Sequence, residues 1–442
     1  MKKTALVAAA LLFIISACSD LTGPKMGTGT SAPADSLSQI TNNGNNGNGS
    51  SGSSGTNSDS TSSTTPKNTS QSGGIWVTAY LASWNQYAPP GGNWGNLPTD
   101  AIDWSAFTQM NYFALKPTSS GTLSPIVAGQ NFNPDRVKAI VSAAHQHNKP
   151  VLFTIGGWGS HDPFAANITP ANRSTFISNI IKVLKQWGFD GVDLDMEPIK
   201  SSDVTNYTTF VKDLRSALDQ IKTPQLSKPL LCAATKWQPA MYAQLQNQFD
   251  QINLMTYDYS GAWQGWVSWY NSPLTNGGDT FPNSTKPLPS ADNSVKQFEN
   301  AGVNASKLGI GIDFYGYVWT GLAQPLQSWI TAPIVKDNVP YYTIMKDYYP
   351  NAKSHWDSKA KAAYLSIAGL VTKQFISYDN EQSIQSKFDY IRQNGLGGAI
   401  IWELGGGYCA DQPAGKRDQL LQAVKQAWTG TGSVTTSIET QP

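Results

Sequence analysis

Charged residues and cysteines are scarce in this chain of 442 residues. Lys and Arg together number 31 and Asp and Glu 30, so charged side chains make up 14% of the sequence and nearly cancel. A low content of charged residues with almost no net charge argues against nucleic acid or an acidic membrane surface as a partner. There are three cysteines, of which Cys232 lies in an apolar run and is expected to be a small core residue. A disulfide between Cys232 and Cys409 is the alternative in an exported chain.

The hydrophobic run near the N-terminus, residues 5–15, is too short to span a bilayer. Lys2 and Lys3 precede it, which is the layout of a secretory signal peptide. The run leads into ISAC at residues 15–18, which resembles the lipobox of bacterial lipoproteins, where the signal peptide is cut before a cysteine that is then acylated. We therefore expect residues 1–18 to be a lipoprotein signal peptide with Cys18 as the lipidated residue. An ordinary signal peptide, cut near Ala17, is the alternative.

Residues 19–74 are rich in Ser, Thr, Gly and Asn and contain few aliphatic side chains. Because such a segment cannot bury enough apolar surface to fold, we expect a disordered linker. It would hold the folded part, residues 75–430, away from a membrane, and residues 431–442 would form a short polar tail. The expected location is outside the cytoplasm, as an outer-membrane or cell-surface lipoprotein or as a secreted protein. The lipid anchor would then be the one membrane contact.

From residue 75 onward, short apolar runs alternate with amphipathic helical patterns. The strand candidates are residues 76–83, 107–115, 150–155, 189–196, 229–235, 251–257, 307–315 and 396–403. Helical patterns cover residues 134–147, 171–187, 207–221 and 294–301. Eight strands that alternate with helices predict an α/β fold, the closed (β/α)8 TIM barrel, whose active site forms at the C-terminal ends of the strands. A doubly wound open sheet is the alternative, but it would have fewer strands and a glycine-rich first turn that this sequence lacks.

Three acids stand two residues apart at the end of the fourth strand candidate: Asp193, Asp195 and Glu197. In a strand they would point to one face, and the apolar residues between them to the other. Neighbouring carboxylates in a low dielectric resist ionising together, so at least one pKa should be raised. Proteins tolerate that cost mainly at a working site. A site for a hard cation such as Mg²⁺ or Ca²⁺ is the alternative explanation. Asp190 is out of phase with the three acids, which indicates a structural role.

The segment FDGVDLDMEP at residues 189–198 resembles the DGxDxDxE signature of glycoside hydrolase family 18, the chitinase family. Three further segments resemble family motifs in the same order. They are TIGGW at 154–158, with threonine in place of the serine of SxGG, MTYD at 255–258, which resembles MxYD, and GGAIIWE at 397–403, which resembles the eighth strand. The resemblance covers about residues 76–428.

The resemblance implies a retaining hydrolysis in which the substrate's own N-acetyl oxygen attacks the anomeric carbon, one of the exceptions to the two-carboxylate scheme. Glu197 would act as general acid and then as base. Asp195 would orient the acetamido group and carry the countercharge for the oxazolinium ion, while Asp193 shares a proton with Asp195. Tyr257 would donate its hydroxyl to the acetamido oxygen. We expect no metal and no cofactor, and a monomer.

The same resemblance implies a sugar-binding site lined by aromatic side chains. The substrate-binding candidates are Tyr80, Gly157, Trp158, Met255, Asp258 and Trp402. Tyr257 and Trp402 could instead be ordinary core aromatics. Further tryptophans follow the ends of strand candidates, and some of them should stack on sugar rings: Trp84, Trp94, Trp237 and Trp263.

Two departures from the family pattern bear on the site. FYGY at residues 314–317 resembles the family's FYGR, but Tyr317 stands where arginine is usual, which removes a fixed cation and one expected sugar contact. Between strands 7 and 8, at about residues 322–395, the segment is too long for one loop and resembles the small α+β insertion of members with deep clefts.

These patterns together predict a chitinase that hydrolyses β-1,4-linked N-acetylglucosamine polymers, with chitin or chitooligosaccharides as its partners. An endo-β-N-acetylglucosaminidase acting on the chitobiose core of N-glycans would use the same residues. A chitin-binding lectin on an inactive barrel is the alternative from another class, although such proteins typically lack the acid found here at Glu197.

Overall fold

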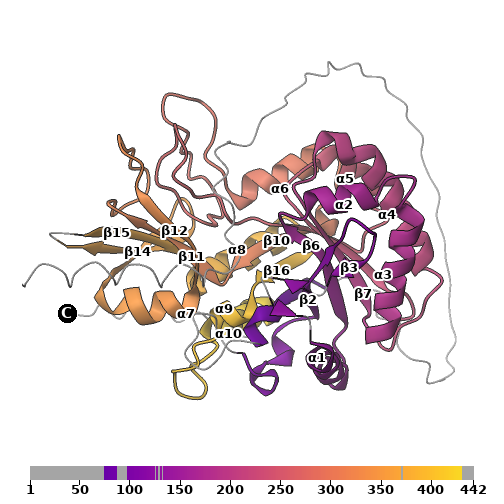
Figure 1. The fold of residues 1–442 in the computed structure, drawn as a ribbon. Helices are drawn as coiled ribbons and strands as arrows, with labels where there is room; N and C mark the ends of the chain where they lie inside the picture. Colours follow the sequence, from indigo (N-terminus) through magenta and orange to yellow (C-terminus); the bar gives the residue numbers. More distant parts are fainter. Residues whose placement is uncertain are drawn as a thin grey trace, which may run out of the picture.

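The computed structural model describes residues 74–86, 97–124, 126–127, 130–131, 133–369 and 372–430 (Figure 1). The predicted signal peptide with Cys18, nearly all of the predicted linker and the polar tail lie outside the described residues. Within the described ranges, no helix is long and apolar enough to cross a membrane.

Eight parallel strands close into a barrel, which confirms the predicted fold class. Hydrogen-bonded neighbours run in the order β1-β16-β10-β9-β8-β7-β6-β2, and β2 pairs back to β1. The barrel strands are β1 (Trp76–Ala82), β2 (Gln109–Pro117), β6 (Val151–Trp158), β7 (Gly191–Glu197), β8 (Leu230–Thr235), β9 (Gln251–Leu254), β10 (Leu308–Asp313) and β16 (Gly398–Trp402). Three short strands accompany β2 at the mouth: β3 (Leu123–Ser124), β4 (Ile126–Val127) and β5 (Gln130–Asn131).

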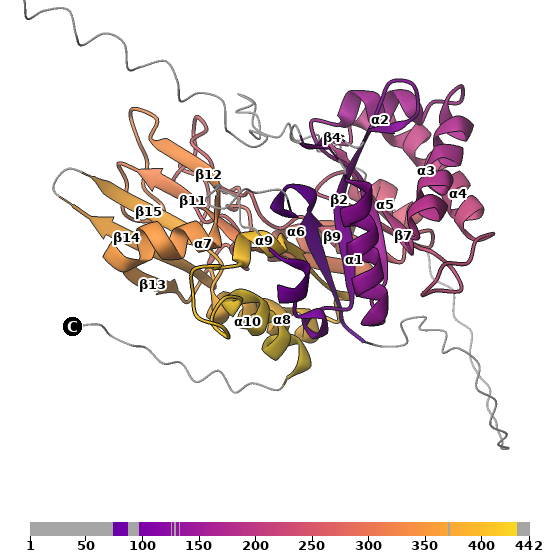
Figure 2. The ribbon, with the colours of Figure 1, turned by 60° about the horizontal axis from the view of Figure 1, so that its bottom comes forward.

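Helices cover the outside of the barrel, as Figures 1 and 2 show. They are α1 (Pro134–Gln146), α2 (His161–Asn167), α3 (Arg173–Trp187), α4 (Val204–Leu218), α5 (Pro239–Leu245), α6 (Ala291–Asn300), α8 (Glu381–Gln393) and α10 (Gln419–Thr429). Their ends carry local signals. The side chain of Asn133 accepts hydrogen bonds from two amides in the first turn of α1. Gly188 ends α3 in the left-handed conformation, with φ of 73°.

Two strand candidates were predicted too long. The candidate at 251–257 ends as β9 at Leu254, because the Thr256 hydroxyl takes the place of the backbone ladder and accepts from the Gly311 N–H at 2.8 Å. The candidate at 307–315 ends as β10 at Asp313, and Tyr315 already belongs to another sheet.

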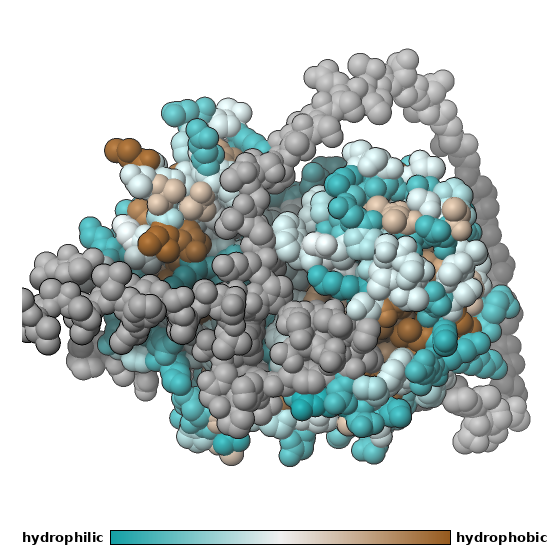
Figure 3. All heavy atoms as spheres, in the orientation of Figure 1, coloured by the Kyte–Doolittle hydropathy of each residue, from teal (hydrophilic) through white to brown (hydrophobic). Residues whose placement is uncertain are grey.

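That second sheet forms the insertion, which stands beside the barrel mouth in Figures 1 and 2. Its five antiparallel strands are β11 (Tyr315–Thr320), β12 (Ile334–Pro340), β13 (Lys353–Asp357), β14 (Ala362–Ala368) and β15 (Lys373–Tyr378). A helical segment that begins with α7 (Tyr341–Thr343) connects β12 to β13. The insertion thus begins earlier than the predicted 322 and ends before 395, because α8 packs against β10 and β16 as a barrel helix. Figure 3 shows apolar spheres on the insertion side of the molecule, whose exposed large hydrophobic residues include Ile330 and Ile334.

A buried ion cluster fastens the insertion to the barrel. The ammonium group of Lys387 on α8 donates to Asp379, which follows β15, and lies 3.6 Å from an oxygen of Asp313 at the end of β10. Lys387 also donates to the Ser272 hydroxyl at 2.6 Å. All four side chains are buried. Because the buried ammonium group lies between two carboxyl groups, it avoids most of the cost of burying an isolated ion, while burial and the charge of Asp379 raise the pKa of Asp313.

The two remaining cysteines, Cys232 and Cys409, are buried free thiols, so the alternative of a disulfide between them is not realised.

Candidate active site

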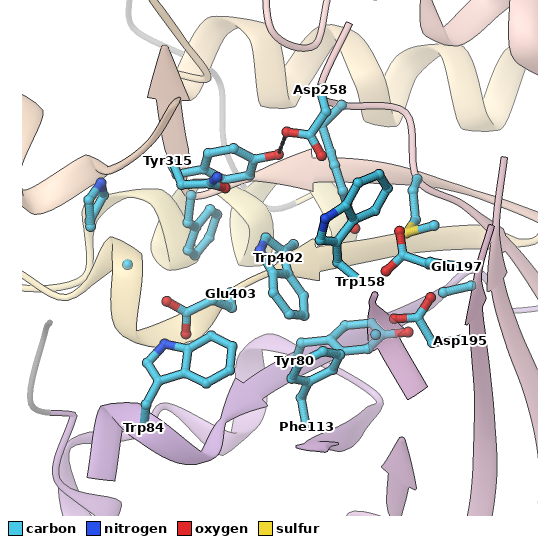
Figure 4. Close-up of a pocket in the computed structure, with 18 of the residues that line it drawn as sticks. Tyr80, Trp84, Phe113, Trp158, Asp195, Glu197, Asp258, Tyr315, Trp402 and Glu403 are labelled. Carbon is cyan, nitrogen blue, oxygen red and sulfur yellow. Dashed lines mark hydrogen bonds between the residues drawn. The ribbon is translucent and has the colours of Figure 1, made fainter. Parts of the chain in front are cut away.

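One pocket opens at the C-terminal ends of the barrel strands and gathers nine of the ten residues predicted to be catalytic or substrate-binding (Figure 4). These nine are Tyr80, Gly157, Trp158, Asp195, Glu197, Met255, Tyr257, Asp258 and Trp402. The tenth, Asp193, is fully buried two residues before Asp195 on the same strand. Segments that lie more than 300 residues apart in the chain therefore converge on one cavity.

The three acids lie on β7 with the predicted alternation. The apolar residues between them belong to the hydrophobic core, whereas Asp195 and Glu197 point into the pocket (Figure 4) and Asp193 is fully buried. Asp193 accepts hydrogen bonds from the hydroxyls of Tyr80, at 2.8 Å, and Thr154, at 2.9 Å, on the same carboxylate oxygen. Thr154 thus supplies a hydroxyl to the acids although it replaces the family's serine. Burial raises the pKa of Asp193 to about 6, against the effect of these hydrogen bonds.

Asp195 and Glu197 have carboxyl groups that face each other in Figure 4. Burial, followed by the charges of Glu197 and Asp193, raises the pKa of Asp195 well above its usual range. Burial also raises the pKa of Glu197 to about 7, while the positive charge of Lys236 opposes this shift. Near neutral pH the site therefore holds at least one carboxyl group in the protonated form and can both donate and accept a proton.

Two glycines on β6 leave room for β7 and for the ring of Phe113 next to the acids. Strand β6 runs beside β7 with Gly156 opposite Asp195. A Cβ at Gly156 would lie 2.1 Å from the Asp195 carbonyl oxygen, and one at Gly157, where φ is 91°, would lie 2.6 Å from the Phe113 ring. Only glycine fits both positions. The structure therefore explains Gly157 by its backbone conformation and by the room it leaves for Phe113. Trp158, the next residue, lies at the pocket rim with 40% of its surface exposed.

An aromatic floor lies opposite the acids and centres on Trp402. Its ring meets Phe113 edge-to-face at 4.7 Å between centroids, and lies 5.6 Å from Tyr80 and 6.3 Å from Trp84. Such packing fixes the indole plane, and a flat apolar ring suits the face of a sugar.

Of the further tryptophans predicted near the site, Trp84 lines the pocket, whereas Trp237 and Trp263 do not, and Trp94 lies outside the described residues.

Tyr257 and Asp258 follow β9 on the insertion side of the pocket. Gly311 makes room for the Tyr257 ring, since a Cβ there would lie 2.6 Å from two ring carbons. Asp258 has a φ of 58°, and one of its carboxylate oxygens accepts hydrogen bonds from the hydroxyls of Tyr315, at 2.5 Å, and Tyr317, at 3.1 Å. Tyr317 thus contacts Asp258 in place of an arginine, but it brings no charge.

Sequence reasoning missed about half of the pocket. The additional lining residues are Phe113, Lys116, Ala234, Phe314, Tyr315, Asn338, Pro340, Glu403 and Gly406. Glu403 accepts hydrogen bonds from the Asn85 side chain and the Gly405 N–H, and burial raises its pKa to about 7. Its place directly after Trp402 in the eighth-strand motif was the available signal. Asn338 and Pro340 come from β12 of the insertion, and no motif marks them. Among the described residues, no group of three or more His, Cys, Asp or Glu side chains could hold a metal ion.

A (β/α)8 barrel whose mouth combines closely spaced acids of raised pKa with an aromatic floor has the architecture of a glycoside hydrolase. The model of the family described as "Glycosyl hydrolases family 18" matches residues 77–407, and the chain belongs to this family.

Similar curated proteins include Chitinase A1 of Niallia circulans, 31% identical over 327 residues that make up 66% of this chain and 44% of that protein. A class V chitinase of Arabidopsis thaliana is 29% identical over 78% of this chain and 89% of its own length. The chain spans about half the length of the first curated relatives. Among solved structures, an immunomodulatory active chitinase of Trichuris suis superposes with a TM-score of 0.67 at 26% identity, covering 80% of this chain and all of that one.

Proposed function

We propose that the protein is a chitinase that hydrolyses β-1,4-linked N-acetylglucosamine polymers with retention of the anomeric configuration. The observation that carries this proposal is the row of three buried acids on β7, of which Asp195 and Glu197 line one pocket together with Trp402 of the aromatic floor. The family supplies the chemistry expected of such a row of acids, and its named relatives include several chitinases.

In the first step, Glu197 protonates the glycosidic oxygen while the bond from C1 to that oxygen breaks. With a pKa raised to about 7, Glu197 keeps its proton at mildly acidic pH and can release it to the leaving group. The acetamido oxygen of the same sugar bonds to C1 and forms an oxazolinium ion. Water then attacks C1, its proton passes to the Glu197 carboxylate, and the ring opens with net retention.

Asp195 is poorly suited to act as the nucleophile itself. Burial and two neighbouring acids raise its pKa well above the usual range, which favours the protonated form of its carboxyl group, and a protonated carboxyl group is a weak nucleophile. Asp193, whose pKa is raised only to about 6, is ionised at pH 7. The pair then carries one negative charge, which compensates the positive oxazolinium ion, while Tyr257 orients the acetamido group.

Specificity follows from this mechanism. Because the nucleophile belongs to the substrate, the sugar at the cleaved bond must carry an N-acetyl group, and cellulose should be inert. A linear chitin chain is favoured over the branched core of an N-glycan because Asn338 and Pro340 of the insertion build a wall on one side of the pocket. Glu197 argues for turnover rather than for binding alone.

The test is a product analysis by mass spectrometry. The purified protein and its Glu197→Gln variant are incubated with chitohexaose, with a high-mannose glycopeptide and with cellohexaose. We expect shorter N-acetylglucosamine oligomers from chitohexaose alone, and only from the unmodified protein. Release of the glycan with one sugar left on asparagine would replace chitinase by an N-glycan-cleaving enzyme. Binding of chitohexaose without any product would favour a lectin.

We further propose that the protein is exported and acylated at Cys18, supported by the lipobox-like ISAC at residues 15–18. In a bacterial host, metabolic labelling with an alkyne-bearing fatty acid should mark the full chain and not its Cys18→Ser variant. Equal labelling of the two, or none, would contradict acylation at Cys18.

A further inference from the structure

A lysine that no motif predicts lies beside the catalytic residues. Lys236 follows the last residue of β8, and its ammonium group donates a hydrogen bond to the backbone carbonyl of Tyr257 at 2.6 Å. The same nitrogen lies 3.7 Å from a carboxylate oxygen of Asp258, and 25% of the side chain is exposed. Lys236 therefore contacts two consecutive residues of the MTYD motif.

Aromatic rings hold the ammonium group on two further sides. Its nitrogen lies 5.7 Å from the ring centroid of Tyr257 and 5.8 Å from that of Tyr259, both within the range of cation–π attraction. One hydrogen bond, one carboxylate and two rings thus fix a long side chain that would otherwise sample many rotamers. A lysine immobilised in this way loses side-chain entropy, which these contacts must offset.

The contact between Lys236 and Asp258 is best understood together with Tyr317, which also contacts Asp258. At this place the family pattern has arginine, and here a neutral hydroxyl donates to Asp258. A positive charge reaches Asp258 instead from Lys236, which follows a different strand and approaches the other carboxylate oxygen. The hydroxyls of Tyr315 and Tyr317 occupy one oxygen of Asp258, and the ammonium group approaches the other.

We propose that Lys236 is a positioning residue that replaces the missing arginine: it holds Tyr257 and Asp258 in place and supplies a positive charge next to the catalytic acids. This inference rests on the proposed function. Lys236 does not line the pocket, so it acts through its neighbours rather than on the sugar.

The charge of Lys236 affects how strongly the catalytic acids hold their protons. The positive charge of Lys236 lowers the pKa values of Glu197 and Asp195, against burial, which is the largest cause and raises them. The negative charge of Asp258 raises the pKa of Glu197, and Lys236 offsets that charge as well. Removal of Lys236 should therefore raise both pKa values. The charged and titratable groups around this cluster are Tyr80, Lys116, Asp193, Asp195, Glu197, Tyr207, Tyr242, Tyr257, Asp258, Tyr259, Asp313, Tyr315, Tyr317 and Asp337.

The experiment compares the pH dependence of kcat/KM on chitohexaose in four proteins. Lys236→Met removes the charge and keeps the length, Lys236→Arg keeps the charge, and Lys212→Met is a matched control on the exposed face of α4. We expect both limbs of the Lys236→Met profile to move to higher pH by about one unit, the order expected for a unit charge within roughly 10 Å at an effective dielectric constant of about 20. Lys236→Arg and Lys212→Met should keep the original limbs.

A second variant tests the replacement itself. Adding Tyr317→Arg to Lys236→Met places a charge at the family's position, and it should move the limbs back toward those of the unmodified protein. A Lys236→Met profile that is lower but has unmoved limbs would reduce Lys236 to a packing role and overturn the inference.

A measurement without turnover separates this inference from the proposed function. In protein labelled with ¹³C at the glutamate carboxyl carbon, the Glu197 signal is identified by its loss in Glu197→Gln and titrated in the unmodified and Lys236→Met proteins. If no chitohexaose is cleaved but the midpoint still rises on removal of Lys236, the proposed function fails and the charge role stands. An unmoved midpoint in folded protein refutes the charge role.

Discussion

Thr154 offers a sharp test of the row of acids because its hydroxyl can be removed without a change of shape. Thr154→Val deletes the donor to Asp193, a contact of 2.9 Å between fully buried side chains. A hydrogen bond to a charged group contributes about 1.5–3 kcal/mol, and one pKa unit corresponds to 1.36 kcal/mol. The pKa of Asp193, now raised to about 6, should therefore rise by about one to two further units.

The consequence for turnover follows from the charge that the Asp193–Asp195 pair carries. At pH 7 the ionised fraction of Asp193 would fall about two- to tenfold, and by more at pH 6. If that charge compensates the oxazolinium ion, kcat on chitohexaose should fall by the same factors, and the acidic limb of the profile should move to higher pH. Thr154→Ser, which keeps the hydroxyl, is the matched control and should leave the limb in place. A Thr154→Val enzyme with an unmoved acidic limb would refute this account of the countercharge.

Three further predictions follow from the same contacts. Glu197→Gln should lower kcat by about 10²–10⁴-fold or more, since the residue acts as both acid and base, while calorimetry should still detect chitohexaose binding; retained turnover would contradict the assignment. Lys387→Met leaves the buried Asp379 and Asp313 carboxyl groups without their cation and should lower the free energy of unfolding by about 3–5 kcal/mol in urea titrations, whereas the exposed Lys212→Met should change little. The pKa values of Asp193 and Glu403 are raised by folding to about 6 and about 7, so the folded protein binds more protons than the unfolded chain between about pH 4 and 7. Stability should therefore fall as pH rises through that window, by about 3 kcal/mol for each group; urea midpoints that rise from pH 5 to pH 8 would contradict the sign.

Local sequence patterns were sufficient to predict the barrel strands and the row of acids. Each predicted strand overlaps a barrel strand because a short apolar run between helical patterns is a property of neighbouring residues in one segment. The same holds for the acids, since a spacing of two places Asp193, Asp195 and Glu197 on one face of any strand. Where a strand ends because of hydrogen bonds to a neighbouring strand, as at Thr256, the predicted end of the strand was wrong.

The pocket's second half could not be read from local patterns. Phe113 looks like any apolar strand residue, and it becomes part of the floor only because β2 brings it to Trp402. Asn338 reaches the pocket only through the pairing of β12 with β11. Such residues carry no spacing signal, because their neighbours in space come from distant parts of the chain.

The sequence by itself determined the barrel, the family and the row of acids, because each depends on short segments whose spacing is fixed by backbone geometry. Only the tertiary structure decided which groups surround those acids and how strongly they hold protons. Lys236 and Tyr317 show the difference: they are 81 positions apart in the sequence, yet both contact Asp258. Burial and the sum of nearby charges arise only when the barrel closes and the insertion folds against it.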